Sequence, residues 1–168
     1  MKGARIYLLL GSNEGDRLYY LTAAVQKLRQ DLATGPAISS AIYETAAWGK
    51  EDQASFLNMA LGMDTLQTPN AVLETALQIE KSLGRTRLEH WGQRSLDIDI
   101  LFYGDQILHT ESLTIPHPHL AKRRFALVPI AEIAPEFIHP ILGKSMKQLL
   151  TECMDPLPVE RFVDTKAS

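Results

Sequence analysis

Cysteine, long apolar runs and an excess of one charge are all scarce in this sequence. The 168 residues include one cysteine, Cys153, which excludes an internal disulfide framework and a zinc site made of several thiolates. The longest early apolar run, Ile6 to Leu10, is too short for a signal peptide or a membrane span. These absences predict a cytoplasmic protein without a membrane partner.

The charge balance is slightly acidic, with 17 basic against 20 acidic side chains and a formal net charge of -3. This balance disfavours a protein that coats nucleic acid, so no nucleic-acid partner is expected. An apolar fraction of 45% is ordinary for a folded domain and excludes a chain that is mainly disordered. A site for a polyanion must therefore be a local concentration of positive charge.

Two common nucleotide-binding loops are also absent. Gly143-Lys144-Ser145 resembles the end of a P-loop, but the position of the required first glycine holds Ile138. The turn from Gly11 to Asp16 lacks the glycine spacing of a dinucleotide fingerprint. These departures exclude a P-loop protein and a Rossmann protein.

Strand and helix patterns are interleaved along the chain and favour one α+β domain over residues 1–168. The predicted strands are 6–10, 38–45, 56–63 and 96–103, and helices are predicted near 18–28, 69–83 and 145–153. The gaps include hairpin lengths as well as crossovers, which indicates a mixed or antiparallel sheet with helices on one side. The tail 156–168 is weakly specified.

Two carboxylates, Asp97 and Asp99, lie two residues apart in an apolar strand. Residues at this spacing project from one face, with Cα atoms ~7 Å apart. Leu96, Ile98, Ile100 and Phe102 are then expected to face the core. Such a pair suits Mg²⁺, as one ion or two. The alternative is a half-buried strand with a solvated polar face.

Basic residues flank this strand on both sides. Arg85, Arg87 and Arg94 precede it, and Lys122-Arg123-Arg124 follows it, with His117 and His119 nearby. Arginine binds phosphate through two parallel hydrogen bonds. Carboxylates together with arginines indicate a site for a metal-bound polyphosphate, and the alternative is a charged surface loop.

Aromatic residues form a third group. Trp48, Phe56, Trp91 and Phe125 lie in or beside polar segments, as expected of rings that stack on a flat heteroaromatic molecule. Asn58 shares a strand face with Phe56, and its amide can both donate to and accept from a heterocycle edge. The alternative is that Phe56 and Phe125 are ordinary core residues.

Taken in order, these motifs resemble a known family. The central run is Gly84-Arg85-Thr86-Arg87 followed by Trp91-Gly92-Gln93-Arg94-Ser95-Leu96-Asp97-Ile98-Asp99-Ile100. Around it stand Gly11-Ser12-Asn13, Tyr43-Glu44-Thr45, Phe56-Leu57-Asn58, Leu113-Thr114-Ile115-Pro116-His117-Pro118 and Arg123-Arg124-Phe125. The set resembles 6-hydroxymethyl-7,8-dihydropterin pyrophosphokinase over about residues 6–136.

The resemblance implies a ferredoxin-like α+β fold and an enzyme of folate biosynthesis. Such an enzyme transfers pyrophosphate from ATP to the hydroxymethyl group of 6-hydroxymethyl-7,8-dihydropterin and releases AMP. The implied co-substrate is ATP, and the implied cofactor is Mg²⁺, as two ions. Separate folate-pathway enzymes are then the candidate protein partners.

The resemblance also implies a role for individual residues. Asp97 and Asp99 would hold the metals and act in catalysis with Arg85 and Arg94. The ATP site would comprise Glu80, Arg85, Arg87, Arg94, Ile100, Thr114, His117 and Arg123. The pterin pocket would comprise Thr45, Phe56, Asn58, Trp91 and Phe125.

The sequence departs from the family pattern at Gln93, Ala46-Ala47, Ser112 and Pro118. None of these departures removes an expected metal ligand. Two other functions use part of the same residue set. A two-metal phosphohydrolase would release phosphate from ATP without pterin, and a non-catalytic nucleotide-binding module would turn nothing over.

Overall fold

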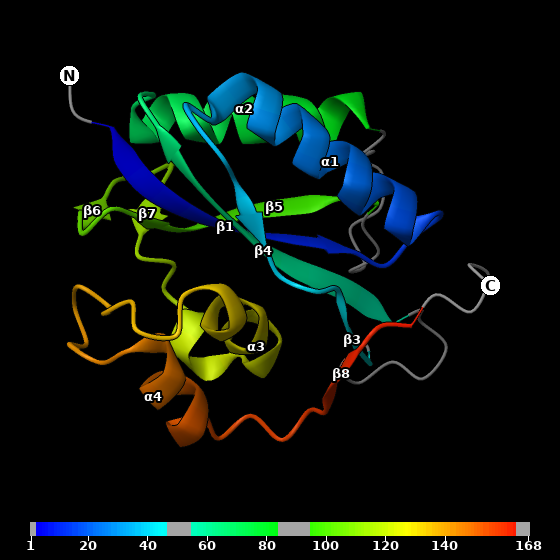
Figure 1. Cartoon of the computed structure of the whole chain (residues 1–168), viewed down its shortest axis with the longest axis vertical. Coiled ribbons are helices and arrows are strands. Elements are labelled where there is room, and N and C mark those ends of the chain that lie inside the picture. Colours follow the sequence, from blue (N-terminus) through cyan, green and yellow to red (C-terminus); the bar gives the residue numbers. More distant parts are fainter. Residues whose placement is uncertain (1–2, 47–54, 84–94, 164–168) are drawn as a thin grey trace.

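The computed structural model describes residues 3–46, 55–83 and 95–163, and its elements are arranged as a sheet between two pairs of helices (Figure 1). Within the sheet, β1 (Ala4–Ser12) pairs with β4 (Phe56–Thr65) on one side and β5 (Asp97–Tyr103) on the other. β4 also pairs with β2 (Ile38–Ser39) and β3 (Tyr43–Thr45), and β3 pairs with β8 (Val159–Arg161). All these pairings are antiparallel. β6 (Leu108–His109) and β7 (Thr114–Ile115) form a separate hairpin.

Side-chain caps explain where three of the helices begin. The carboxylate of Asp16 accepts from the backbone of Tyr19 at the start of α1 (Arg17–Leu32). Thr68 caps α2 (Pro69–Ser82), and Ser145 caps α4 (Met146–Glu152). α3 (Arg124–Ile133) follows a short 3₁₀ turn and contains Pro129. None of the described helices is long and apolar enough to span a membrane.

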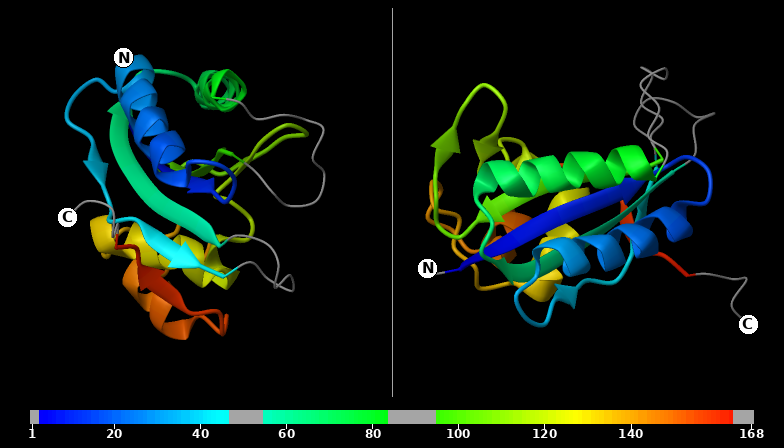
Figure 2. Two further views of the ribbon diagram at one scale, coloured as in Figure 1. Left: turned by 90° about the vertical axis from the view of Figure 1, so that its right-hand side faces the viewer. Right: turned by 90° about the horizontal axis from the view of Figure 1, so that it is seen from above.

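Helices cover both faces of the sheet, which corrects the expectation that they lie on one side. α1 and α2 pack on one face, around Ile6, Leu8 and Leu10 of β1. α3 and α4 pack on the other, around Tyr7 and Leu9 (Figure 2). Because alternate residues of β1 are buried in different clusters, its run of apolar residues needs partners on both sides.

A bulge in β5 explains why one predicted core residue faces the other way. Tyr7 pairs with Phe102 but Leu8 pairs with Ile100, so Leu101 is an extra residue in β5. Ile98 and Ile100 pack toward α1 and α2 as predicted. Phe102 was expected beside them, but the bulge turns it toward α3 and α4.

The predicted strand 38–45 is divided in two for a similar reason. Ser39 pairs with Leu61 and Tyr43 pairs with Asn58, so residues 40–42 lie opposite residues 59–60. The hydroxyl of Ser40 accepts from the backbone N–H of Ala60 at 2.9 Å and replaces a backbone acceptor there.

Candidate functional site

A pocket of about 230 Å³ opens on the α3 face of the sheet, where β1, β3, β4 and β5 meet the start of α3. It brings together residues predicted for the metal, the phosphates and the heteroaromatic ring: Thr45, Phe56, Asn58, Asp97, Asp99, Arg123 and Phe125. Leu9, Gly11, Ala46 and Leu157 complete its lining. The three separate sequence groups therefore share one cavity.

Strand register explains why these side chains meet. On one side of β1, Gly11 pairs with Asp97 and Leu9 pairs with Asp99. On the other side, Gly11 pairs with Asn58. Residues that pair directly across an antiparallel sheet share a face. The two carboxylates therefore point to the same side as Asn58, as the period-two spacing predicts.

Gly11 keeps the floor of the pocket open. A Cβ atom on this residue would lie 2.5 Å from Nδ2 of Asn58. The same Nδ2 donates to the backbone oxygen of Leu10 at 3.2 Å. Glycine at this position therefore allows the Asn58 amide to lie flat against β1, with its orientation set by one hydrogen bond.

Two buried oxygen atoms of the pocket have no hydrogen-bond partner among residues 3–46, 55–83 and 95–163. They are Oγ1 of Thr45 and Oδ1 of Asn58, in side chains of residues that are 4% and 5% exposed. Buried polar atoms are almost always paired, because leaving one unpaired costs about 1–3 kcal/mol. Phe56 and Phe125 add apolar wall to the same cavity. The pocket therefore fits a flat ring with polar atoms along its edge.

Positive charge reaches the pocket through Arg123, which lies beside Phe125. The guanidinium carbon of Arg123 lies 5.7 Å from the centre of the Phe125 ring. The pKa of His117 is lowered to about 4, chiefly by burial and also by the charges of Arg123 and His119, although Asp97 acts in the opposite direction. His117 is therefore neutral at pH 7. Its Nδ1 accepts from the backbone N–H of His119 at 3.2 Å, so its proton is carried on Nε2.

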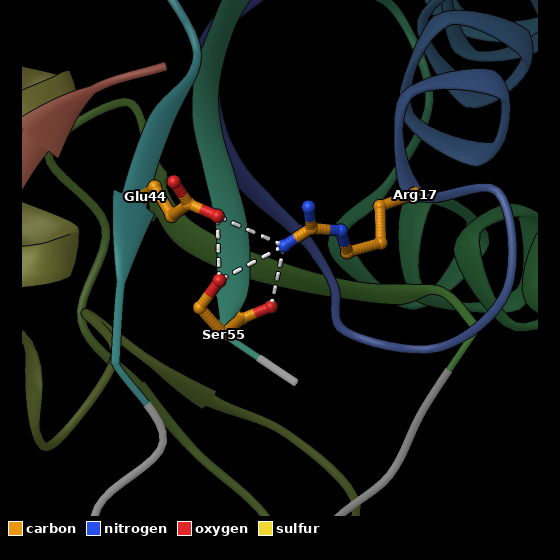
Figure 3. A network of polar contacts seen from close by, with 3 residues as sticks. All are labelled: Arg17, Glu44 and Ser55. Atoms are coloured by element: carbon orange, nitrogen blue, oxygen red, sulfur yellow. Dashed lines mark hydrogen bonds and ion pairs between the residues drawn. The ribbon is translucent and has the colours of Figure 1, made fainter. Parts of the chain in front are cut away.

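A polar network lies behind the pocket, on the α1 face of the sheet (Figure 3). Arg17 Nη1 donates to Glu44 Oε2 at 3.1 Å and to the backbone oxygen of Ser55 at 2.8 Å. The Ser55 hydroxyl donates to the same Glu44 oxygen at 2.5 Å. These hydrogen bonds lower the pKa of Glu44, and the bond from Ser55 has the largest effect. The network ties the end of β3 and the start of β4 to α1, next to the pocket residues Thr45 and Phe56.

Residues 7–135 match the family model for 7,8-dihydro-6-hydroxymethylpterin-pyrophosphokinase. The chain belongs to this family. Its activity is that of a pyrophosphokinase of folate biosynthesis that acts on ATP and hydroxymethyldihydropterin.

Curated relatives support this family membership over nearly the whole chain. A protein of Aquifex aeolicus is 43% identical over 89% of this chain and 92% of its own length. One of Bacillus subtilis is 48% identical over 77% of this chain and 78% of its own. Both are named 2-amino-4-hydroxy-6-hydroxymethyldihydropteridine pyrophosphokinase.

Solved structures of HPPK-DHPS chains share the fold, which confirms the ferredoxin-like α+β prediction. One from Plasmodium falciparum has a TM-score of 0.72 at 18% identity. Another, in complex with substrates, has a TM-score of 0.67 at 16% identity. Each covers 90% of this chain, and this chain spans less than half of each of them, 45% and 43%.

Four described residues that were predicted for the ATP site lie outside the lining of this pocket: Glu80, Ile100, Thr114 and His117. Ile100 belongs to the core between the sheet and helices α1 and α2, and Thr114 lies in β7. Glu80 is 2% exposed on α2, and its Oε2 accepts from the backbone N–H of Ile98 at 2.7 Å. Glu80 therefore fixes the backbone between the two aspartates.

Several predicted residues fall outside the described part of the chain. They are Arg85, Arg87, Trp91 and Arg94. Gln93 and Ala47, two of the departures from the family pattern, fall outside it as well. In contrast, Leu157 lines the pocket although the sequence pattern singled out nothing after Pro156. Burial alternates along the segment that holds Leu157, and this alternation depends on contacts with distant parts of the chain.

Among the described residues, no group of three or more His, Cys, Asp or Glu side chains could hold a metal ion. The candidate ligands are therefore the Asp97 and Asp99 pair. Mg²⁺ commonly uses one or two protein carboxylates and completes its shell with phosphate and water. A pair of aspartates that lines a pocket beside an arginine fits this mode of binding.

Proposed function

We propose that the pocket beside Asp97 and Asp99 is where this chain carries out a Mg²⁺-dependent transfer of pyrophosphate. In this reaction the hydroxymethyl oxygen of 6-hydroxymethyl-7,8-dihydropterin attacks the β-phosphorus of ATP. The bond between that phosphorus and the oxygen it shares with the α-phosphate breaks, and AMP leaves. The observation that carries the proposal is one cavity lined by both an unpaired polar edge and a carboxylate pair.

The polar edge supports a pterin as the occupant. A pterin ring carries donors and acceptors along one side, and these match the open Oγ1 of Thr45 and Oδ1 of Asn58. Phe125 and Phe56 supply apolar surface for the ring. A site built to hydrogen-bond a ligand edge rejects analogues that lack it, because its buried atoms would then stay unpaired.

The carboxylates and basic groups support the phosphate half of the reaction. Asp97 and Asp99 would hold two Mg²⁺ ions, which when bound would neutralise phosphate charge and acidify the attacking hydroxyl. Arg123 binds the phosphates, and neutral His117 donates through Nε2. Glu80 keeps the strand between the aspartates in place through Ile98.

The remaining residue assignments rest on the resemblance. Arg85 and Arg94 are proposed to act on the phosphates with Arg87 in support, and Trp91 is proposed to complete the pterin pocket. Ile100 and Thr114 are proposed for the ATP site. A single domain over residues 1–168, a cytoplasmic location and separate folate-pathway enzymes as partners also remain proposals. The HPPK-DHPS neighbours are in keeping with such partners.

The test is AMP formation from ATP with and without 6-hydroxymethyl-7,8-dihydropterin, in Mg²⁺ and then in EDTA. We expect AMP only when both the pterin and Mg²⁺ are present. Release of ADP or phosphate without pterin would instead identify a phosphohydrolase. A folded protein without nucleotide turnover would contradict the proposal and favour a binding module.

A further inference from the structure

The segment that links α4 to β8 has a regular pattern of exposure. Cys153, Asp155, Leu157 and Val159 are partly buried, and the residues between them are exposed. Met154 is 91% exposed. Period-two exposure means that one side of an extended chain lies against the protein. The segment lies after residue 135, where the match to the family model ends.

One carboxylate joins this segment to the start of α3. Asp155 Oδ2 accepts from the backbone N–H of Arg124 at 3.1 Å. Asp155 Oδ1 accepts from the backbone N–H of Leu157 at 3.0 Å. The Arg124 side chain returns the contact, since its Nε donates to the backbone oxygen of Asp155 at 3.1 Å. Asp155 is therefore held at both of its carboxylate oxygens and at its backbone oxygen.

The two backbone groups held by Asp155 belong to a lining residue of the pocket and to a direct neighbour of two others. Arg124 stands between Arg123 and Phe125, which line the pocket, and Leu157 lines it as well. One side chain thus sets the positions of a phosphate-side residue, an aromatic wall and an aliphatic wall. Losing it would let both parts of the wall shift together.

Strand pairing holds the other end of the segment. Val159 in β8 pairs with Thr45 in β3, the residue whose hydroxyl is open in the pocket. Leu157 lies two residues before Val159 on the chain, between this pairing and the Asp155 contacts. Fixed on both sides, the Leu157 side chain has a defined place in the lining.

We propose that Leu157 is a wall of the pterin site and that Asp155 is the positioning residue for this wall and for Arg123 and Phe125. The proposal rests on the proposed function, because it takes the pterin as the occupant of this pocket. Leu157 covers the apolar surface of the ring and keeps water from it. Its contribution is to binding of the pterin and not to the transfer step.

The test compares Leu157→Ala with Met154→Ala, an exposed control on the same segment. We expect Leu157→Ala to raise KM for 6-hydroxymethyl-7,8-dihydropterin about tenfold, the effect of a lost aliphatic contact in a binding pocket. KM for ATP and kcat at saturating pterin should stay within about twofold. Leu157→Met should restore most of the affinity, and Met154→Ala should behave as the unmodified chain.

Asp155→Asn sharpens the test because asparagine keeps the shape but accepts at only one of the two oxygens. We expect it to raise KM for the pterin, and to raise it much less when Leu157 is already alanine, since the two residues act on one wall. A thermal unfolding scan of each variant excludes loss of fold.

The outcomes separate this inference from the proposed function. If the unmodified chain forms AMP from ATP and pterin but Leu157→Ala leaves KM for the pterin unchanged, the inference is overturned and the function stands. An equal rise in KM for ATP and KM for the pterin in Leu157→Ala would also overturn it. If the unmodified chain forms no AMP, the function itself fails.

Discussion

The two faces of the sheet use the same strands but are covered to different extents. Toward α1 and α2, buried apolar residues continue along β1 from Ile6 to Leu10. Toward α3 and α4, the apolar cluster includes Tyr7 and Leu9 and then stops, and the next residue on that face is Gly11. Beyond that point the face carries Asn58 and the two aspartates.

This difference separates stability from function within single strands. A fully covered face contributes free energy of folding in proportion to the apolar area it buries. A partly covered face leaves room for a ligand and keeps polar groups there, at some cost in stability. Substitutions on the covered face should therefore lower stability, and substitutions on the partly covered face should lower activity. The following predictions test this difference.

The largest effect on activity is expected from Asp97→Asn on the open face. Removing the carboxylate charge should lower kcat/KM for AMP formation about 10²–10³-fold, a loss typical of a charged group in a preorganised site. The midpoint of thermal unfolding should change little. Steady-state assays with a Mg²⁺ titration measure kcat/KM. A near-normal value would show that Asp97 is not part of the metal site.

Leu8→Ala is the matched substitution on the closed face. Leu8 is fully buried among residues that pack on α1 and α2, so its truncation should lower the free energy of unfolding by about 2–5 kcal/mol. Urea unfolding measures this loss. The rate per folded molecule should stay near normal at low temperature, and a large fall in kcat there would show that the two faces are not separable.

Gly11→Ala tests where the open face begins. The added Cβ would displace the Asn58 amide, whose Nδ2 lies 2.5 Å away. We expect KM for the pterin to rise about tenfold and stability to fall by about 1–3 kcal/mol, as for an overpacked site. Unchanged pterin kinetics would show that the orientation of Asn58 is not set by this contact. The control is Gly35→Ala, where a Cβ meets nothing within 4 Å.

The smallest effect is expected from Glu44→Gln, which links the two faces at the end of β3. Because hydrogen bonds from Ser55 and Arg17 lower the pKa of Glu44 in the folded state, the unfolded chain binds its proton at higher pH. The stabilisation is present above the unfolded pKa, about 4.3, and is lost as pH falls through the lowered folded pKa.

Urea unfolding at pH 7 and at pH 3 measures this difference. The unmodified chain should be modestly more stable than Glu44→Gln at pH 7, and the gap should narrow at pH 3. The effect is small because the Glu44 side chain is 38% exposed. A gap that widens at pH 3 would contradict the assigned direction.

The sequence could predict what depends on neighbours along the chain. Asp97 and Asp99 share a face because strands alternate, and Asp16 begins a helix because its side chain reaches the first turn. Phe102 was placed on the wrong face because the bulge at Leu101 is set by pairing with β1, a strand far away in sequence.

Features built from distant segments were beyond such reasoning. The contacts of Asp155 with Arg124, and of Arg17 with Glu44, join parts of the chain that no local pattern connects. Thr45 joined Asn58 and Phe125 in the predicted pocket only through the family resemblance, because no local pattern connects it to them. Coverage of both faces also escaped prediction. Pro129 interrupts the apolar segment that forms α3, so no helix was predicted there.

The strand that carries the aspartates has one further consequence. β5 is an outermost strand of the sheet among the described residues, and exposed edges invite pairing with other chains. Its Ile98 N–H is bound by Glu80, and its Leu101 carbonyl accepts from the backbone of His117 at 3.0 Å. These bonds occupy two of the backbone groups that an intruding strand would need, which makes edge-to-edge pairing with another chain less favourable at this margin of the sheet.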